Sequence, residues 1–167
     1  MKIAIGADHA GFDFKEKVKE FLIKEGYSVE DYGAYKFDKD DDYPEFIGKA
    51  SEAVSKDPEG TRGIIFGRSG QAEAMLANKF RNVRCALFYA PAVPVDAVDV
   101  TGRVSTDSFE IIRLTREHNN ANVLCLGTEF INFDTAKQLI DIFLNTEFSD
   151  EERHIRRLNK IRIIENK

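Results

Sequence analysis

One stretch of the sequence combines a tight glycine turn with a single carboxylate. Residues 67–73 read Gly-Arg-Ser-Gly-Gln-Ala-Glu, between an apolar run at residues 63–66 and a helix-like run at residues 74–79. This strand–turn–helix order exposes backbone N–H groups that can bind an anion. The carboxylate of Glu73 could therefore remove a proton beside a carbonyl while these N–H groups stabilise the oxyanion.

Two more candidate residues follow the first apolar run of the chain. Asp8 and His9 come directly after residues 2–6. In parallel sheets, ligands bind beyond the carboxyl ends of the strands. We therefore expect Asp8 and His9 to share one crevice with Glu73.

Three basic side chains in the C-terminal half of the chain could complete a site that binds a phosphorylated sugar and opens its ring. The imidazole of His118 suits ring opening because its unperturbed pKa lies near 6.5. Arg153 and Arg157 are four residues apart, so they lie on one helical face and can hold one phosphate together.

Each candidate also has a purely structural interpretation. Glu73 could be a first-turn residue favoured by the helix dipole, and His118 could simply end a helix. Asp8 could be a helix cap. The basic residues 153–157 could form a solvated face, and His154 has only a structural interpretation. The acidic residues 38–42 lack the spacing of a calcium loop and are expected to be solvated.

Strands and helices are expected to alternate along the chain. Apolar residues recur at helical spacing between short apolar runs, and Asp134 is expected to cap one helix. A last helix is expected at about residues 150–165, and a surface loop at about residues 89–107. The alternation predicts an α/β fold with a parallel sheet covered on both faces. The expected strands are residues 2–6, 28–32, 63–66, 83–88 and 121–126.

The bulk composition restricts the class of protein. A chain of 167 residues favours one domain, and a net charge of −5 argues against general nucleic-acid binding. There is neither a signal peptide nor an apolar run of membrane-spanning length, so we expect a cytoplasmic protein. Cys85 and Cys125 lie in apolar runs and are expected to be buried thiols.

Taken together, the motifs resemble the ribose-5-phosphate isomerase B family, which also includes galactose- and allose-6-phosphate isomerases. The resemblance implies a three-layer α/β sandwich with a five-stranded parallel Rossmann-like sheet. It also implies a homodimer or dimer of dimers with active sites shared between subunits, and no metal or organic cofactor. The matching segments are Ile-Gly-Ala-Asp-His-Ala-Gly at 5–11, Asp-Tyr-Pro at 42–44, Gly-x-Ser-Gly-x-x-Glu at 67–73 with Ala-Asn-Lys at 77–79, Arg-Glu-His-Asn-Asn-Ala-Asn-Val-Leu at 116–124 and Arg-His-x-Arg-Arg at 153–157.

The family resemblance implies an aldose–ketose isomerase that acts through an enediolate, with ribose 5-phosphate as the first expected substrate. Many members carry a catalytic cysteine at the position of Gly67, whereas another branch uses a glutamate that matches Glu73. Ser69 and the backbone amides from Gly70 to Glu73, which include Gln71 and Ala72, would hold the enediolate oxygen, and Gly67 would also bind the substrate. The resemblance further implies that His118, helped by Asp8, opens the furanose ring, that Asn119 binds the sugar or the intermediate, and that Tyr43 lines the sugar pocket. Phosphate binding would fall to His9, Arg153 and Arg157.

The sequence departs from the family pattern in three places. Glu129 stands where the family has a phosphate-contacting arginine, and Arg68 and Ala72 stand where glycines are common. Arg68 either restores the lost positive charge or pairs with Glu129. The third departure is an insertion of about fifteen residues within 89–107, which could cover the site or remodel the dimer.

These departures leave several functions open. The pocket could accept another sugar phosphate, such as allose or galactose 6-phosphate, or the protein could be a non-catalytic sugar-phosphate sensor. A nucleotide-binding Rossmann enzyme is disfavoured, because the first strand is not followed by Gly-x-Gly-x-x-Gly and residues 67–70 lack the Lys-Ser/Thr of a P-loop.

Overall fold

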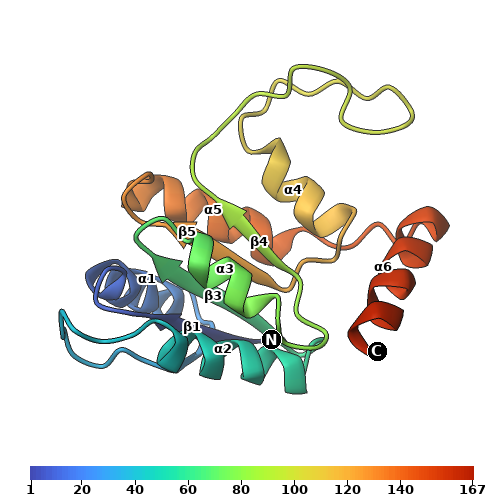
Figure 1. The fold of residues 1–167 in the computed structure, drawn as a ribbon. Coiled ribbons are helices and arrows are strands. Elements are labelled where there is room, and N and C mark those ends of the chain that lie inside the picture. The colour runs from blue at the N-terminus through green and yellow to red at the C-terminus, as the bar shows by residue number, and fades with distance from the viewer.

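The centre of the molecule is a five-stranded sheet, shown in Figure 1 by a computed structural model that describes all of residues 1–167. The strand order is β2-β1-β3-β5-β4, and every neighbouring pair is parallel. This confirms the predicted α/β fold with five parallel strands. The strands are β1 (Lys2–Ala7), β2 (Ser28–Asp31), β3 (Thr61–Gly67), β4 (Cys85–Phe88) and β5 (Val123–Gly127).

Helices cover both faces of the sheet and make it the middle of three layers (Figure 1). Successive side chains of a strand point to opposite faces, so Leu124 joins one apolar core and Cys125 the other. The first core contains side chains of α1, α4 and α5, and the second contains side chains of α2 and α3. The helices are α1 (Phe12–Lys24), α2 (Pro44–Lys56), α3 (Gln71–Ala77), α4 (Glu110–Glu117), α5 (Phe133–Asn145) and α6 (Glu152–Glu165).

The helix ends carry residues that are typical of those positions, but one predicted N-cap is wrong. Pro44 is the first residue of α2, and Gly26 has a φ of +87° just past α1. The cap of α5 is Asn132, not the expected Asp134. Asn132 has the extended backbone of an N-cap, and its side chain accepts a hydrogen bond from the backbone N–H of Thr135 at 2.9 Å.

Two segments project from the three layers (Figure 1). Residues 89–109 contain no helix or strand and connect β4 to α4. Arg103 anchors this loop through ion pairs with Asp99, Glu110 and Glu117. The other segment, α6, lies at the β4 side of the sheet. None of the helices has the length and apolar character needed to cross a bilayer.

Candidate active site

The carboxyl ends of β1 and β3 bring two sequence motifs together. Ala7 and Phe66 are register partners, so Asp8 and the turn that starts at Gly67 leave the sheet side by side. Thr128, which follows β5, binds the same turn twice: its backbone N–H donates to the carbonyl oxygen of Gly67 at 3.0 Å, and its hydroxyl donates to the same oxygen at 3.2 Å. This edge of the sheet therefore holds the motifs that the sequence placed in one crevice.

Glu73 occupies space that only a glycine at position 67 leaves open. Glu73 is the third residue of α3 and is 6% exposed. A Cβ atom on Gly67 would lie 2.1 Å from both the Cδ and Oε1 atoms of Glu73. The absence of a side chain at Gly67 is thus a condition for the position of this carboxylate.

The surroundings of Glu73 favour its protonated form. Burial is the largest cause and raises the pKa of the Glu73 carboxyl, and the negative charge of Asp8 raises it further. The backbone N–H of Glu73 itself acts in the opposite direction. A carboxylate with a raised pKa can both accept and return a proton near neutral pH, as a general base in isomerisation must.

The turn before Glu73 is held by a left-handed glycine and a buried thiol. Gly70 has a φ of +73°, and a Cβ atom there would lie 2.6 Å from Cδ1 of Leu87. The Sγ–H of Cys125 donates to the carbonyl oxygen of Gly70 at 3.1 Å, and burial raises the pKa of this thiol. The sequence predicted a buried Cys125 but not its support of the turn.

The turn and the start of α3 present hydrogen-bond donors that can bind an anion. The Oγ atom of Ser69 accepts a 3.5 Å hydrogen bond from the backbone N–H of Gln71. The N–H groups of the first helical turn have no intrahelical acceptor, so Gln71, Ala72 and Glu73 contribute donors at this edge. Anionic oxygens are stabilised by such fixed donors.

Asp8 combines a structural role with a place in the site. Its Oδ1 atom accepts hydrogen bonds from the N–H groups of Ala10 at 3.0 Å and Gly11 at 3.3 Å. The side chain therefore stabilises the turn before α1, and its charge also acts on Glu73. It lies at the carboxyl edge of the sheet, with Glu73.

His9 has a partner that the sequence analysis missed. Its backbone N–H donates to Oδ1 of Asp41 at 2.9 Å, and its Nδ1 atom lies 2.7 Å from the same oxygen. The hydrogen bond to Asp41 is the largest cause of the raised pKa of His9. Asp41 is thus not a merely solvated member of residues 38–42. Because it follows no strand, only the position of its loop beside Tyr43 could have indicated this role.

Replacing Asp41 with Asn is expected to lower the pKa of His9, because the variant removes both the charged acceptor and its attraction for the imidazolium. His9 would then lose its proton at a lower pH, and its attraction for an anionic ligand would weaken at neutral pH. An NMR titration of His9 measures the change in its pKa, and KM measures the change in ligand binding. Asp38→Asn, at an exposed position of the same loop, is the matched control. An unchanged His9 titration in Asp41→Asn would contradict the prediction.

Arg68 and Glu129 form an ion pair at the same edge. Their Nη1 and Oε1 atoms lie 2.8 Å apart, and the side chains are 66% and 54% exposed. Of the two alternatives for Arg68, the structure shows pairing with Glu129. The pair carries no net charge, so it does not simply replace the arginine that the family pattern places at position 129.

His118 and Asn119 lie at the opposite end of the sheet from Glu73. His118 ends α4 and precedes the amino end of β5, whereas Glu73 follows the carboxyl end of β3. At about 3.3 Å per residue, the length of β5 alone separates these ends by roughly 15 Å. One chain therefore does not bring His118 to Glu73 or to Asp8. The same holds for Asn119, which follows His118.

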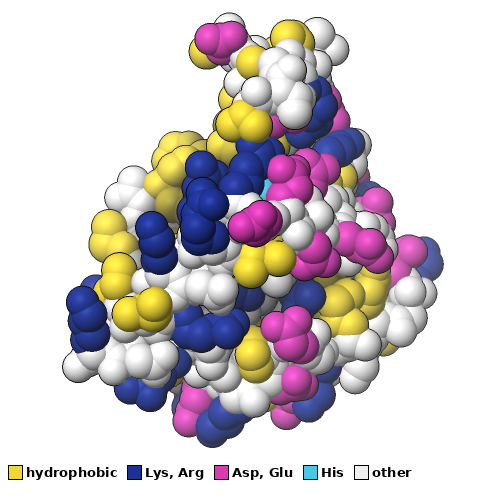
Figure 2. Space-filling model, turned by 90° about the vertical axis from the view of Figure 1, so that its right-hand side faces the viewer, with side chains coloured by type: hydrophobic (Ala, Val, Ile, Leu, Met, Phe, Trp, Pro, Cys, Tyr) yellow, Lys and Arg dark blue, Asp and Glu magenta, His cyan; other side chains and the backbone are white.

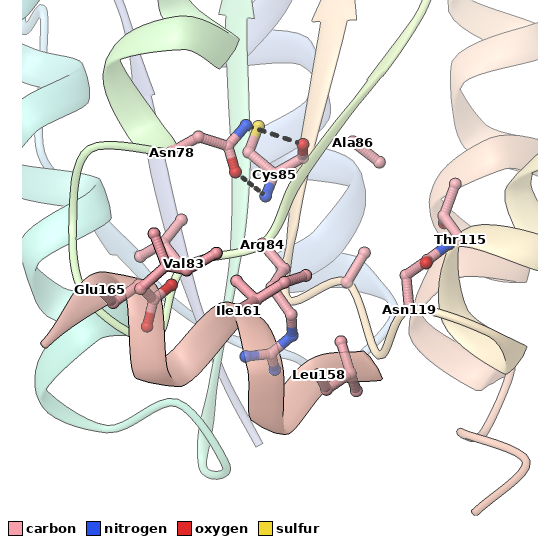
Figure 3. A pocket seen from close by; sticks show the side chains of 12 residues that line it. Asn78, Val83, Arg84, Cys85, Ala86, Thr115, Asn119, Leu158, Ile161 and Glu165 are labelled. Atoms are coloured by element: carbon pink, nitrogen blue, oxygen red, sulfur yellow. Dashed lines mark hydrogen bonds between the residues drawn. The ribbon is translucent and has the colours of Figure 1, made fainter. Parts of the chain in front are cut away.

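A cavity of 510 Å³ lies between β4 and α6, at this second end (Figure 3). Asn119 and Thr115 reach it from one side, and Leu158 and Ile161 of α6 from another. Asn78 closes its upper rim and exchanges hydrogen bonds with the backbone of Cys85. Asn119 is the only predicted substrate-binding residue in its lining, so the cavity does not coincide with the Glu73 site.

His118 packs against α6. Its ring stacks on the ring of His154, with the centroids 4.4 Å apart and the planes inclined by 13°. Burial, followed by the nearby His118 and Arg153, lowers the pKa of His154. Arg153 pairs with Glu151 at 2.8 Å, and Arg157 is exposed one turn further along.

The chain matches known proteins over nearly its whole length. The family profile described as Ribose/Galactose Isomerase matches residues 3–97 and 103–161, with the gap inside the loop of residues 89–107. Ribose-5-phosphate isomerase B of Mycobacterium leprae is 36% identical over 159 residues, which cover 95% of this chain and 86% of the relative. A putative sugar phosphate isomerase of Bacillus subtilis, YwlF, is 31% identical and covers 100% and 99% of the two chains.

Solved structures agree with this match. Ribose-5-phosphate isomerase B of Mycoplasma genitalium, with bound ribulose-5-phosphate, has a TM-score of 0.85 and 31% identity over 99% of this chain and 97% of its own. The enzyme from Clostridium thermocellum has a TM-score of 0.83 and 34% identity, over 99% and 98% of the two chains. On the combined evidence of sequence, fold and site, the chain belongs to the ribose/galactose isomerase family.

Proposed function

We propose that the protein interconverts an aldose phosphate and its ketose phosphate, with ribose 5-phosphate and ribulose 5-phosphate as the pair. The observation that carries the proposal is the buried carboxylate of Glu73 in the space beside Gly67, next to the N–H groups of the first turn of α3, which have no intrahelical acceptor. Relatives and solved structures named ribose-5-phosphate isomerase B support the choice of sugar.

In this reaction Glu73 takes the proton from C2 of the open-chain aldose and returns it to C1. The electrons of the broken C–H bond form the enediolate, whose oxygen accepts hydrogen bonds from Ser69 and the N–H groups of residues 70–73. The proton of the O2 hydroxyl moves to O1, and reprotonation at C1 restores the Glu73 carboxylate and leaves the carbonyl at C2. The proton only moves within the substrate, so the reaction needs no redox partner and we propose no metal or organic cofactor.

The active site is proposed to form between two copies of the chain. The carboxyl edge supplies Asp8, His9, Tyr43 and Glu73, while the opposite end supplies the group of His118. A twofold dimer can place the first group of one copy against the second group of its partner, and this yields two complete sites.

Features of α6 support this arrangement. Ile155, Ile161, Ile163 and Ile164 are between 40% and 67% exposed, although such side chains are usually buried. Lys and Arg side chains also gather on the molecular face that carries α6 (Figure 2). We propose that the partner covers the isoleucines and that Arg153 and Arg157 hold its substrate phosphate together with the partner's own His9.

Sugar binding completes the proposed assignments. His118 opens the furanose ring and Asn119 holds the open-chain sugar, both from the second copy, while Tyr43 lines the pocket beside His9. We further propose that residues 1–167 form a single domain in which residues 89–107 are an inserted loop. Phosphorylated sugars do not cross membranes readily, and this substrate class fits a cytoplasmic protein.

A panel of sugar phosphates tests the function. The purified protein is expected to form ketose from ribose 5-phosphate with a higher kcat/KM than from allose or galactose 6-phosphate. If allose or galactose 6-phosphate gave the highest kcat/KM, that sugar would be the substrate. The Arg68–Glu129 pair would then be the expected cause of the changed specificity. Binding of all three sugars without turnover would instead indicate a sensor.

A further inference from the structure

The stacked pair of His118 and His154 joins two helices that have few other contacts. His154 belongs to the first turn of α6, and His118 ends α4. Parallel planes and a centroid separation of 4.4 Å are the geometry of a direct ring-on-ring contact. The imidazole of His118 therefore has one face covered by its own chain and cannot tilt toward that side.

The nitrogen atoms of His154 do not explain why a histidine is buried there. The residue is 3% exposed, and its Nε2 atom is buried without a hydrogen-bond partner. An unpaired buried polar group costs free energy, so this position would be better filled by an apolar side chain if only packing mattered. What the ring does provide is a flat surface against His118.

The charged groups around the pair do not fix the His118 ring in place. Arg153 and Arg157 of α6, and Glu151 just before it, act on His154 by charge, and Arg153 forms an ion pair with Glu151. On α4, the neighbouring Glu117 pairs with Arg103 of the loop. The ring of His154 is thus the contact that can define the plane of His118.

We propose that His154 is a positioning residue for ring opening, which it serves by stacking on His118 and fixing the plane of that imidazole. The inference rests on the proposed function, which assigns ring opening to His118. Proton transfer to or from a sugar oxygen depends on the alignment of the imidazole, and small misplacements of a catalytic group cost large factors in rate. His154 acts through His118 and touches no substrate.

Two substrates separate ring opening from isomerisation. Ribose 5-phosphate is mostly a closed ring, whereas ribulose 5-phosphate is open, because its C5 oxygen carries the phosphate. In D₂O, exchange of the C1 hydrogen of ribulose 5-phosphate requires the base Glu73 but not ring opening. Ketose formation from ribose 5-phosphate requires both steps.

His154→Leu and His154→Phe form the matched pair of variants, since both are apolar but only Phe keeps a flat ring. We expect His154→Leu to lower kcat/KM for ribose 5-phosphate about tenfold or more, with C1 exchange within about threefold of wild type. His154→Phe should keep both rates within about threefold. Equal losses of the two rates in His154→Leu, no loss at all, or a Phe variant as impaired as Leu would each overturn the proposal.

A measurement without turnover tests the stack directly. The chain has three histidines, so protein labelled at the histidine ring carbons gives a spectrum with few resonances. The ring current of His154 should displace the His118 resonance, and His154→Leu should remove that displacement. An unmoved His118 resonance would overturn the stacking. A wild type that neither isomerises nor exchanges would refute the proposed function, while this spectrum would still decide the stack.

Discussion

Replacing Glu73 with Gln is expected to lower kcat about 10³-fold, because the amide cannot accept the C2 proton and no second carboxylate lies in the Gly67 space. KM should change little, since the shape of the side chain is kept. In the wild type, kcat should fall as the pH drops through the raised pKa of Glu73. Steady-state assays between pH 5 and pH 9, about two units around neutrality, measure both effects.

The same substitution is expected to stabilise the fold at neutral pH. Burial raises the pKa of Glu73, so the folded state binds this proton more tightly than the unfolded chain does. Stability from this group is therefore present at low pH and is lost as the pH rises and the buried carboxyl ionises. Gln escapes this cost, so its gain in Tm should be larger at neutral pH than in acid. A loss of Tm at neutral pH would contradict the expectation.

Gly67→Ala is the companion variant, because it leaves the base in the chain but displaces it. The added methyl would meet the Glu73 carboxyl at 2.1 Å, so the side chain must leave its place. We expect a loss of about 10²-fold in kcat. Gly48→Ala, in α2, is the control for adding a methyl group without a clash, since a Cβ atom there would meet only the side chain of Phe80 at 3.8 Å, and this variant should keep its kcat. Full activity in Gly67→Ala would show that the base is elsewhere.

Two inactive variants are expected to restore activity when they are mixed. His118→Asn removes one half of the proposed site and Glu73→Gln the other half. In a mixed dimer, one site carries both changes and the other carries neither. Random exchange makes half of the dimers mixed, so the mixture should regain about a quarter of the wild-type activity.

The complementation needs exchange of subunits, which brief treatment with mild denaturant and refolding of the mixture provides. Each variant treated alone in the same way is the control and should stay inactive. A mixture that stays inactive, although mass spectrometry detects mixed dimers, would place Glu73 and His118 in one chain and refute the shared site. The structure makes that outcome unexpected, because β5 separates the two residues.

Local patterns were enough to predict the sheet. Apolar runs such as residues 2–6 and 121–126 are short and bounded by turn residues, and the intervening helical stripes require parallel strands. The cap of α5 shows the limit of this reasoning. Asn132 and Asp134 are both good cap residues, and only the backbone angles distinguish them.

The carboxyl-edge half of the site was predictable because parallel strands align their ends. Asp8 and Glu73 each follow a strand, so sheet topology alone brings them together. The pairing of His9 with Asp41 depends on the path of a loop, and the stack of His118 on His154 depends on how α6 packs. Neither the path of the loop nor the packing of α6 leaves a periodic signal in the sequence. The shared site that we propose also needs a partner copy, which no intrachain pattern encodes.

The contact between positions 67 and 73 restricts how a chain of this family could exchange a cysteine base for the glutamate base that we propose. A cysteine at position 67 and the buried glutamate at position 73 would claim the same volume, so one chain cannot hold both in working geometry. A lineage that exchanges one base for the other must pass through a chain with a crowded site or a chain with no base. A series of single substitutions therefore passes through a chain with an impaired site. The residue at position 67 thus limits which base a descendant chain can use.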